Sequence, residues 1–240
     1  MKKIVSALLL LAPVVTAADA APSYIRPDNL GGYNVTYNYT DKPKNDWYMT
    51  FRAELGLLNF KNTYYSDDVG YNGYDKYSME PVFGGSVAIG KKFGYWWRGE
   101  IEAGYTGNFK DSGEGLTFNF SAPYVLANAI YDFSSGLYLG GGVGVAVPMQ
   151  SWDWDGFVVG PRRKTSLGAM GALMFGYAHK LDDNFVLDLR YRLAGFSGNK
   201  FAADYQIQNS AGAVIGQFEF ENKIGLVLDN SLSVALRYEF

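Results

Sequence analysis

SLSVALRYEF, residues 231–240, alternates strictly between apolar side chains and small or charged ones. The apolar positions are Leu232, Val234, Leu236, Tyr238 and Phe240. Successive side chains of a β-strand point to opposite faces, so this stretch predicts a strand with one apolar and one polar face.

The same alternation recurs along the chain and predicts eight strands. The first seven are expected at about 47–60, 82–93, 95–108, 119–133, 137–147, 165–179 and 185–193, and the eighth ends at Phe240. Tight turns are expected at Gly94, 134–136 and 182–184, and long loops at 61–81, 109–118, 148–164 and 195 to about 225. Regularly alternating short and long connections are typical of transmembrane barrels.

Charge gathers on the face of these strands that lies opposite the apolar one. The apolar face of the first strand, from Trp47 to Leu57, carries no charge. The opposite faces hold five cations and five anions: Arg52, Glu54, Arg98, Glu100, Glu102, Asp188, Arg190, Arg192, Arg237 and Glu239. Because a charge at the bilayer midplane of a barrel costs about 2–4 kcal/mol, this sorting indicates a lipid-exposed wall.

Three segments carry a resemblance to a known family: LRYEF (236–240), YLGGGVGVA (138–146) and DDNFVLDLRYR (182–192). They resemble the small bacterial outer-membrane barrels of the OmpA, OmpX and Opa type. The resemblance implies an all-β, eight-stranded, antiparallel, up-and-down transmembrane barrel with short periplasmic turns and long extracellular loops. It also implies a Gram-negative outer membrane and an assembly signal at Leu236, Tyr238 and Phe240 that the barrel-assembly machinery reads. A soluble lipocalin-like barrel, with its apolar face inside, is the alternative.

The N-terminal residues predict export. Met1-Lys2-Lys3 precedes an apolar run, 4–15, that is too short to span a bilayer, and small residues follow at 18 and 20. We therefore expect a cleaved signal peptide at 1–20, a periplasmic lead at 21–46 and the barrel domain at 47–240. The alternation from Tyr33 to Tyr39 also allows a short strand.

Composition argues against several functions. The chain has no cysteine, one histidine and a net charge of −3, so thiolate chemistry is excluded and nucleic acid is not an expected partner. His179 is expected at the periplasmic rim as a solvated residue. Trp152-Asp153-Trp154-Asp155-Gly156 matches part of a calcium loop weakly, and a turn with two exposed tryptophans is the expectation. We expect no enzyme, metal or cofactor.

The ten inward charges have two interpretations. An eight-stranded barrel is just wide enough for side chains to fill it, and unpaired buried charges are costly. An ion-pair plug is therefore the first interpretation. The second is a narrow polar path, which would make the protein a small, porin-like diffusion pore for ions or small solutes.

The long loops offer a second place for function. Tyr64, Tyr65, Tyr71, Tyr74 and Tyr77, with Trp152 and Trp154, are recognition candidates, because tyrosine among Asn, Gly and Asp resembles a binding-loop composition. The alternative is that these tyrosines form a structural aromatic belt at the lipopolysaccharide boundary. A hairpin is expected from 205–209 and 214–220. The predicted protein is a structural, monomeric barrel with surface loops for recognition or adhesion. Its expected partners are outer-membrane lipid, lipopolysaccharide, the assembly machinery and a host or extracellular ligand.

Overall fold

The computed structural model describes residues 25–27, 33–35, 46–66, 71–94, 96–113, 116–154 and 158–240. The chain divides into two compact units, Met1–Asp41 and Lys42–Phe240. Within the described ranges, no helix is long and apolar enough to cross a membrane. The predicted signal peptide, 1–20, lies outside these ranges.

The first unit contains one small sheet. Strand β1 (Ile25–Pro27) pairs antiparallel with β2 (Tyr33–Val35), and Ile25 lies opposite Val35. A short strand at Tyr33 is thus present, and its partner comes from the same unit rather than from the barrel sheet. Most of the remaining lead up to residue 46 lies outside the described residues.

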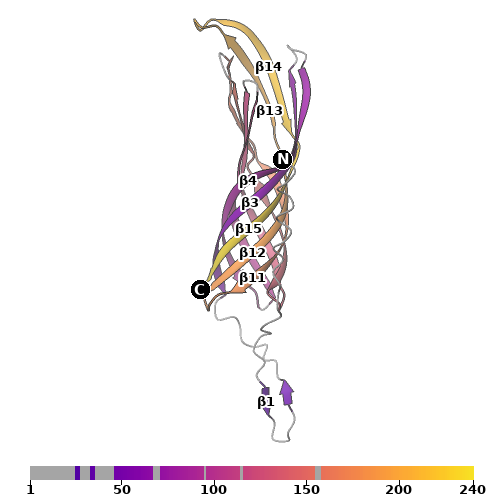
Figure 1. The fold of residues 1–240 in the computed structure, drawn as a ribbon, viewed down its shortest axis with the longest axis vertical. Coiled ribbons are helices and arrows are strands. Elements are labelled where there is room, and N and C mark those ends of the chain that lie inside the picture. The colour runs from indigo at the N-terminus through magenta and orange to yellow at the C-terminus, as the bar shows by residue number, and fades with distance from the viewer. Residues whose placement is uncertain are drawn as a thin grey trace. The chain divides into compact units, whose positions relative to one another are not determined.

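The second unit is a closed antiparallel barrel (Figure 1). Its ring runs β3-β4-β5-β6-β7-β11-β12-β15 and closes where β15 pairs with β3. The bounds are β3 Trp47–Ser66, β4 Tyr71–Lys92, β5 Trp97–Gly113, β6 Leu116–Asp132, β7 Leu137–Ala146, β11 Gly168–Lys180, β12 Phe185–Ser197 and β15 Leu226–Glu239. The predicted all-β, eight-stranded, up-and-down barrel is confirmed. Its short turns lie at one end, which we call the periplasmic end.

The predicted long loops are wrong in extent, because they are largely strands. Most of 61–81 belongs to β3 and β4, and 109–118 is mostly β5 and β6. The segment 148–164 contains β8 (Met149–Trp154), β9 (Val158–Val159) and the start of β10 (Arg163–Thr165). The segment 195–225 contains the end of β12, then β13 (Lys200–Gln208) and β14 (Val214–Ile224).

β-Bulges explain why the alternation of side chains in the sequence did not predict that these strands continue. The β3–β4 register shifts between Leu58 and Phe60, and Met79 on the facing strand adopts a φ of 59°. The Met79 amide donates to Oδ1 of Asn59 at 3.0 Å, which secures the bulge. A bulge resets the side-chain period, so a strict period-2 pattern ends there although the strand continues.

Beyond the bulges, the strands form an extension that we call the head (residues 59–79, 107–119, 149–165 and 199–224 where described). β8 pairs with β6, and β10 pairs with β8. β13 and β14 form the predicted hairpin, with Gly212 at positive φ in its turn. This hairpin continues β12 and β15, and its base pairs with β3. Figure 1 shows the head strands rising from one end of the ring.

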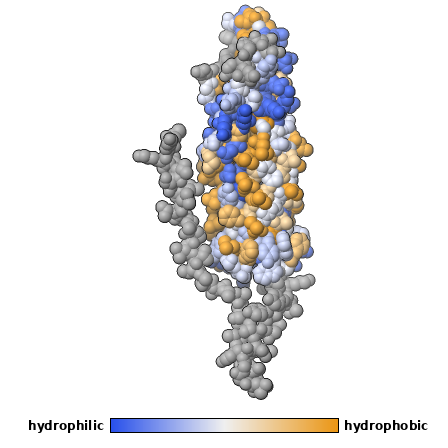
Figure 2. All heavy atoms as spheres, turned by 90° about the vertical axis from the view of Figure 1, so that its right-hand side faces the viewer, coloured by the Kyte–Doolittle hydropathy of each residue, from blue (hydrophilic) through white to orange (hydrophobic). Residues whose placement is uncertain are grey.

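The outer wall of the ring is apolar. Outward side chains such as Phe83 (79% exposed) and Val143 (72% exposed) alternate with buried ones, and Figure 2 shows hydrophobic residues gathered over the wall. At the periplasmic end the Tyr131 ring lies between those of Trp96 and Trp97, at centroid distances of 6.1 and 5.1 Å. An apolar band with an aromatic girdle is the surface of a transmembrane barrel.

A charge on this wall should destabilise the barrel. We expect Val143→Arg, in the middle of β7, to lower the free energy of unfolding by about 2–4 kcal/mol. Urea unfolding in phospholipid vesicles measures this, with Val143→Leu as the control. Equal stabilities of the two variants would mean that Val143 does not face the hydrocarbon core.

Candidate functional site

The barrel interior collects the predicted charges. All ten sit on inward positions of β3, β5, β12 and β15, and none is more than 7% exposed. Asp229, at the upper end of β15, joins them at 1% exposed, although the sequence reasoning missed it. Period-2 alternation through Ser231 and Ser233 would have placed Asp229 on the same face.

Glu102 is the centre of the ion-pair network. Its carboxylate lies 3.3 Å from Arg52, 3.1 Å from Arg190 and 3.0 Å from Arg192. Arg190 also reaches Glu100 at 2.9 Å, and Arg192 reaches Glu54 at 2.7 Å. Buried arginines are thereby bound from two sides, which is the geometry that a buried ion pair needs to offset its desolvation.

The network continues toward the periplasmic end. Arg98 binds Asp132 at 3.0 Å and lies 3.8 Å from Asp188. Arg237 contacts Asp188 at 3.7 Å and Glu239 at 3.1 Å. Lys92 completes this end through Glu239 at 2.5 Å. Lys92 and Asp132, at the ends of their strands, were not among the predicted residues.

Three inward tyrosines, which were not among the predicted site residues, each face a glycine in register. Tyr48 lies opposite Gly90, Tyr124 opposite Gly104 and Tyr138 opposite Gly176. A side chain on any of these glycines would collide with the tyrosine ring. Cross-strand aromatic–glycine pairing of this kind covers the backbone of the glycine strand. An inward Tyr facing an inward Gly is the signal that was available in the sequence.

The tyrosine hydroxyls complete the network. The hydroxyl groups donate to Glu100, Glu102 and Asp188 at 3.1, 3.0 and 2.6 Å for Tyr48, Tyr124 and Tyr138, respectively. Guanidinium groups also lie over the rings, with Arg192 4.8 Å from the Tyr124 centroid and Arg98 4.7 Å from that of Tyr138. Each tyrosine therefore serves both as a filler and as a hydrogen-bond donor.

An aromatic core fills the interior above the ion pairs. The Phe60 ring packs on Phe109 and Phe120 at centroid distances of 5.7 and 5.2 Å, and Phe118 packs on Trp152 at 4.5 Å. The buried cluster also takes in Phe196 and, in the head, Phe201, Tyr205 and Phe220. It runs without interruption from the ring into the head.

The expectation of two exposed tryptophans is therefore wrong. Trp152 is 4% exposed, and Trp154 packs against Tyr205, Phe218 and Phe220 at 5.6–5.7 Å. The segment is strand β8 rather than a turn, so the tryptophans point inward while Asp153 between them points out. Asp155 and Gly156 lie outside the described residues, among which no cluster suited to a metal occurs.

The tyrosine candidates separate into different environments. Tyr77 packs on Phe60 and donates to Asp111 at 2.8 Å, and burial together with Asp111 raises the pKa of its phenol. Tyr74 is 63% exposed beneath the Lys61 ammonium, and Tyr65 is also exposed. Tyr64 contacts Asp75 at 3.5 Å. Tyr71 pairs with Ser66 through its backbone, and its side chain lies outside the description.

The remaining predicted residues lie on the outer surface. Leu236, Tyr238 and Phe240 are exposed on one face, with the Tyr238 ring between those of Phe185 and Phe240. His179 is exposed near the end of β11 and stacks on Tyr177 at 6.4 Å.

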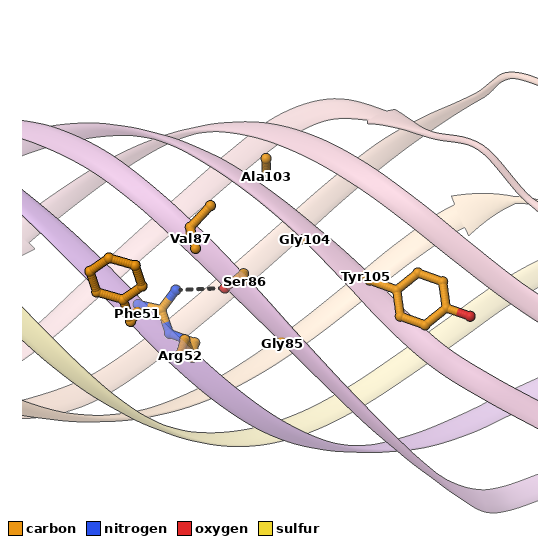
Figure 3. A pocket seen from close by; sticks show the side chains of 8 residues that line it. All are labelled: Phe51, Arg52, Gly85, Ser86, Val87, Ala103, Gly104 and Tyr105. Carbon is orange, nitrogen blue, oxygen red and sulfur yellow. Dashed lines mark hydrogen bonds between the residues drawn. The ribbon is translucent and has the colours of Figure 1, made fainter.

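The described residues line one depression on the outer wall and another at the periplasmic end. Figure 3 shows one on the outer wall, where Phe51, Val87 and Tyr105 surround Gly85. On the inner side of the same strands, Arg52 donates to the Ser86 hydroxyl at 3.2 Å. A second depression lies at the periplasmic end, lined by Lys92, Asp132 and Arg237 among others.

A closed ring with an apolar wall, an aromatic girdle and charges confined to its interior defines a transmembrane β-barrel of the bacterial outer-membrane type. No protein-family model matches the sequence, and no curated protein is significantly similar to it.

Solved structures with similar folds are outer-membrane proteins. OprG from Pseudomonas aeruginosa is 12% identical, with a TM-score of 0.48, and the match covers 82% of this chain and 97% of that one. Ail, the attachment invasion locus protein of Yersinia pestis, is 14% identical (TM-score 0.41; 80% and 98% covered). The outer membrane protease OmpT of Escherichia coli is 12% identical (TM-score 0.47; 82% and 97% covered). A shared fold does not choose among functions.

Removing the central carboxylate should unfold the barrel more easily. Glu102→Gln leaves three buried arginines without their shared partner, so we expect a loss of about 3–5 kcal/mol in the free energy of unfolding. Denaturant titration of the refolded protein measures it. The control is Asp183→Asn, which removes an exposed pair with Lys180 and should cost no more than about 1 kcal/mol. Comparable losses in both variants would refute a central role for Glu102.

Proposed function

We propose that this protein is a closed, non-catalytic outer-membrane barrel whose rigid head recognises a ligand outside the cell. The proposal rests on one observation: two layers of side chains fill the interior of the barrel. An ion-pair layer centred on Glu102 occupies the ring, and an aromatic core lies directly above it and continues into the head.

The ion-pair layer opposes passage of ions. The carboxylates of Glu54, Glu100 and Glu102 bind arginines of β12, a strand that neighbours neither β3 nor β5, 88 to 138 residues away in sequence. A permeating ion would have to displace these partners in a medium of low dielectric constant, which costs several kcal/mol for each unpaired charge.

The aromatic core has a second consequence, since it ties the head to the ring. Phe60 of the head packs on Phe120 of β6, which lies below the head and stacks on Phe196 of β12 at 6.4 Å. Within the head, Trp152 and Trp154 of β8 pack on Phe220 of β14. Strand pairing of β14 with β3 adds a backbone connection. A head held in this way presents its outer side chains with little conformational entropy to lose on binding, which favours recognition.

The exposed side chains of the head suit such a role. Tyr65 and Tyr74 are exposed on β3 and β4, and Ile207, Val214 and Ile215 are exposed near the turn of the β13–β14 hairpin. Aromatic anchors and exposed apolar residues set among polar ones are typical of protein-binding surfaces.

A small diffusion pore is the second candidate, because some buried donors lack a protein partner. Among the described residues, Arg52 Nη2 and Arg98 Nη1 make no protein hydrogen bond. Water molecules would satisfy such groups, and a chain of them would make a narrow polar path.

Conductance separates the two candidates. We expect the refolded barrel in a planar lipid bilayer to give no steady current, because both layers block the interior. Heat-modified mobility on a gel verifies that the silent protein is folded. A steady, salt-dependent current that Arg192→Glu alters would overturn the closed barrel and favour the pore.

Recognition is tested on cells that display the protein. We expect adhesion to a cultured epithelial layer, and a several-fold reduction with the triple variant Tyr74→Ser, Ile207→Ser and Ile215→Ser, because anchor side chains carry most of the energy of an interface. Gln206→Ser on the same hairpin is the control for folding and display. Adhesion that the triple variant leaves unchanged contradicts recognition by this surface.

A further inference from the structure

Three consecutive cations lie on the outer surface of the head, where the chain enters β10. They are Arg162, Arg163 and Lys164, and we call them the basic strip. All three side chains are exposed. Arg162 lies 4.0 Å from the Asp153 carboxylate, and Arg163 donates to the sulfur of Met149 at 3.4 Å. Among the described residues, no carboxylate lies within salt-bridge distance of Arg163 or Lys164. The strip therefore presents an excess of positive charge to the outside.

Two carboxylates lie beside each other on the outer face of the β13–β14 hairpin. Asp204 of β13 is directly opposite Glu219 of β14, both side chains are exposed, and we call them the acidic pair. Like charges directly opposite each other destabilise a sheet, so positive charge placed over this pair is favourable. Glu221, the next outward residue of β14, pairs with Lys200 at 2.8 Å and is not counted in the pair.

The strip and the acidic pair lie side by side at one level of the head. β9 runs antiparallel to β13, with Val159 opposite Gln206, and the chain continues from there into the strip. The Tyr205 hydroxyl donates at 2.6 Å to the carbonyl of Pro161, the residue before the strip. This contact fixes the strip next to the segment of β13 that carries Asp204. Across the part of the chain that the structure describes, no ion pair joins the strip to Asp204.

Such an arrangement is self-complementary. Copies of a barrel share one orientation in the membrane, so a symmetric pair has its two-fold axis along the membrane normal. Rotation about that axis keeps the height of each patch, and it turns the strip of one copy toward the acidic pair of the other. A soluble polyanion would be attracted by the strip and repelled by the acidic pair, and a polycation would meet the reverse. A second copy of the chain matches both patches at once.

We propose that the head docks against the head of a second copy in the same membrane, with the basic strip of each copy on the acidic pair of the other. The sequence predicted a monomer because the two patches are far apart along the chain and meet only through the pairing of β9 with β13. This inference goes beyond the proposed function. Its partner lies in the same membrane, and it uses none of the anchor residues Tyr74, Ile207 and Ile215.

Cross-linking tests the proposal directly, because the chain has no cysteine of its own. Ala202 is exposed on β13, on the same face as Asp204, and lies close to the proposed two-fold axis. The control position is the exposed Ser112 of β5, a strand that pairs with neither β13 nor β14. Ala202→Cys and Ser112→Cys are reconstituted in phosphatidylcholine vesicles and treated with a short bis-maleimide. We expect several-fold more dimer from Ala202→Cys, and equal yields would overturn the proposal.

Charge reversal tests which groups meet. In the Ala202→Cys background we expect R162E/R163E and D204K/E219K each to lower the dimer yield at least about fivefold, because like charges then face each other across the interface. An equal mixture of the two variants should restore the yield, since the reversed strip of one copy meets the reversed pair of the other. Heat-modified mobility on a gel verifies that both variants are folded. A mixture that gives no more dimer than either variant alone would refute the pairing.

Two further conditions define where the partner lies. Diluting the vesicles should leave the yield unchanged, and a yield that falls with dilution would mean that copies meet across facing membranes, against the proposal. Salt at about 1 M, where the Debye length is about 3 Å, should lower the yield. Tyr74→Ser, Ile207→Ser and Ile215→Ser together should not change it, so a loss of adhesion and a loss of pairing can be told apart.

Discussion

Pairing of buried charge is the constraint on which the structure depends. A barrel wall in lipid excludes charge, so the charged half of each alternating strand must face an interior too narrow for bulk water. Ten predicted charges and Asp229 enter that space, and arginines bind carboxylates from strands that are not their neighbours in the ring. The observed strand register brings these partners together.

The tyrosine–glycine pairs show how the interior is filled without strain. Each inward glycine gives room for a ring from the neighbouring strand, and the ring then carries a hydroxyl to a carboxylate of the network. Volume and hydrogen bonding are satisfied by the same side chain. Above this layer the carboxylates give way to phenylalanine and tryptophan, so the interior changes from ionic to apolar along the barrel axis.

The head is ordered because the interior below it changes from ionic to apolar packing. Its strands continue those of the ring past the bulges at Leu58 and Thr106, and its core is the upper part of the barrel core. Outward side chains no longer need to be apolar where the strands extend beyond the membrane. Lysines, aspartates and tyrosines then occupy the face that valine and leucine occupy below, which is why the head is where contacts outside the membrane can form.

The sequence by itself determined the strands of the ring, their inward and outward faces and the inward position of all ten charges, because period 2 is a local property of the chain. It did not determine strand lengths at the head, since a bulge shifts the period by one residue. Trp152 and Trp154 were expected in an exposed turn because aspartates and a glycine stand among them, although the register on β6 continues unbroken into β8. Only the tertiary structure decided which arginine meets which carboxylate and that Tyr48 covers Gly90. Those contacts depend on register between distant strands, which side-chain alternation along a single strand does not encode.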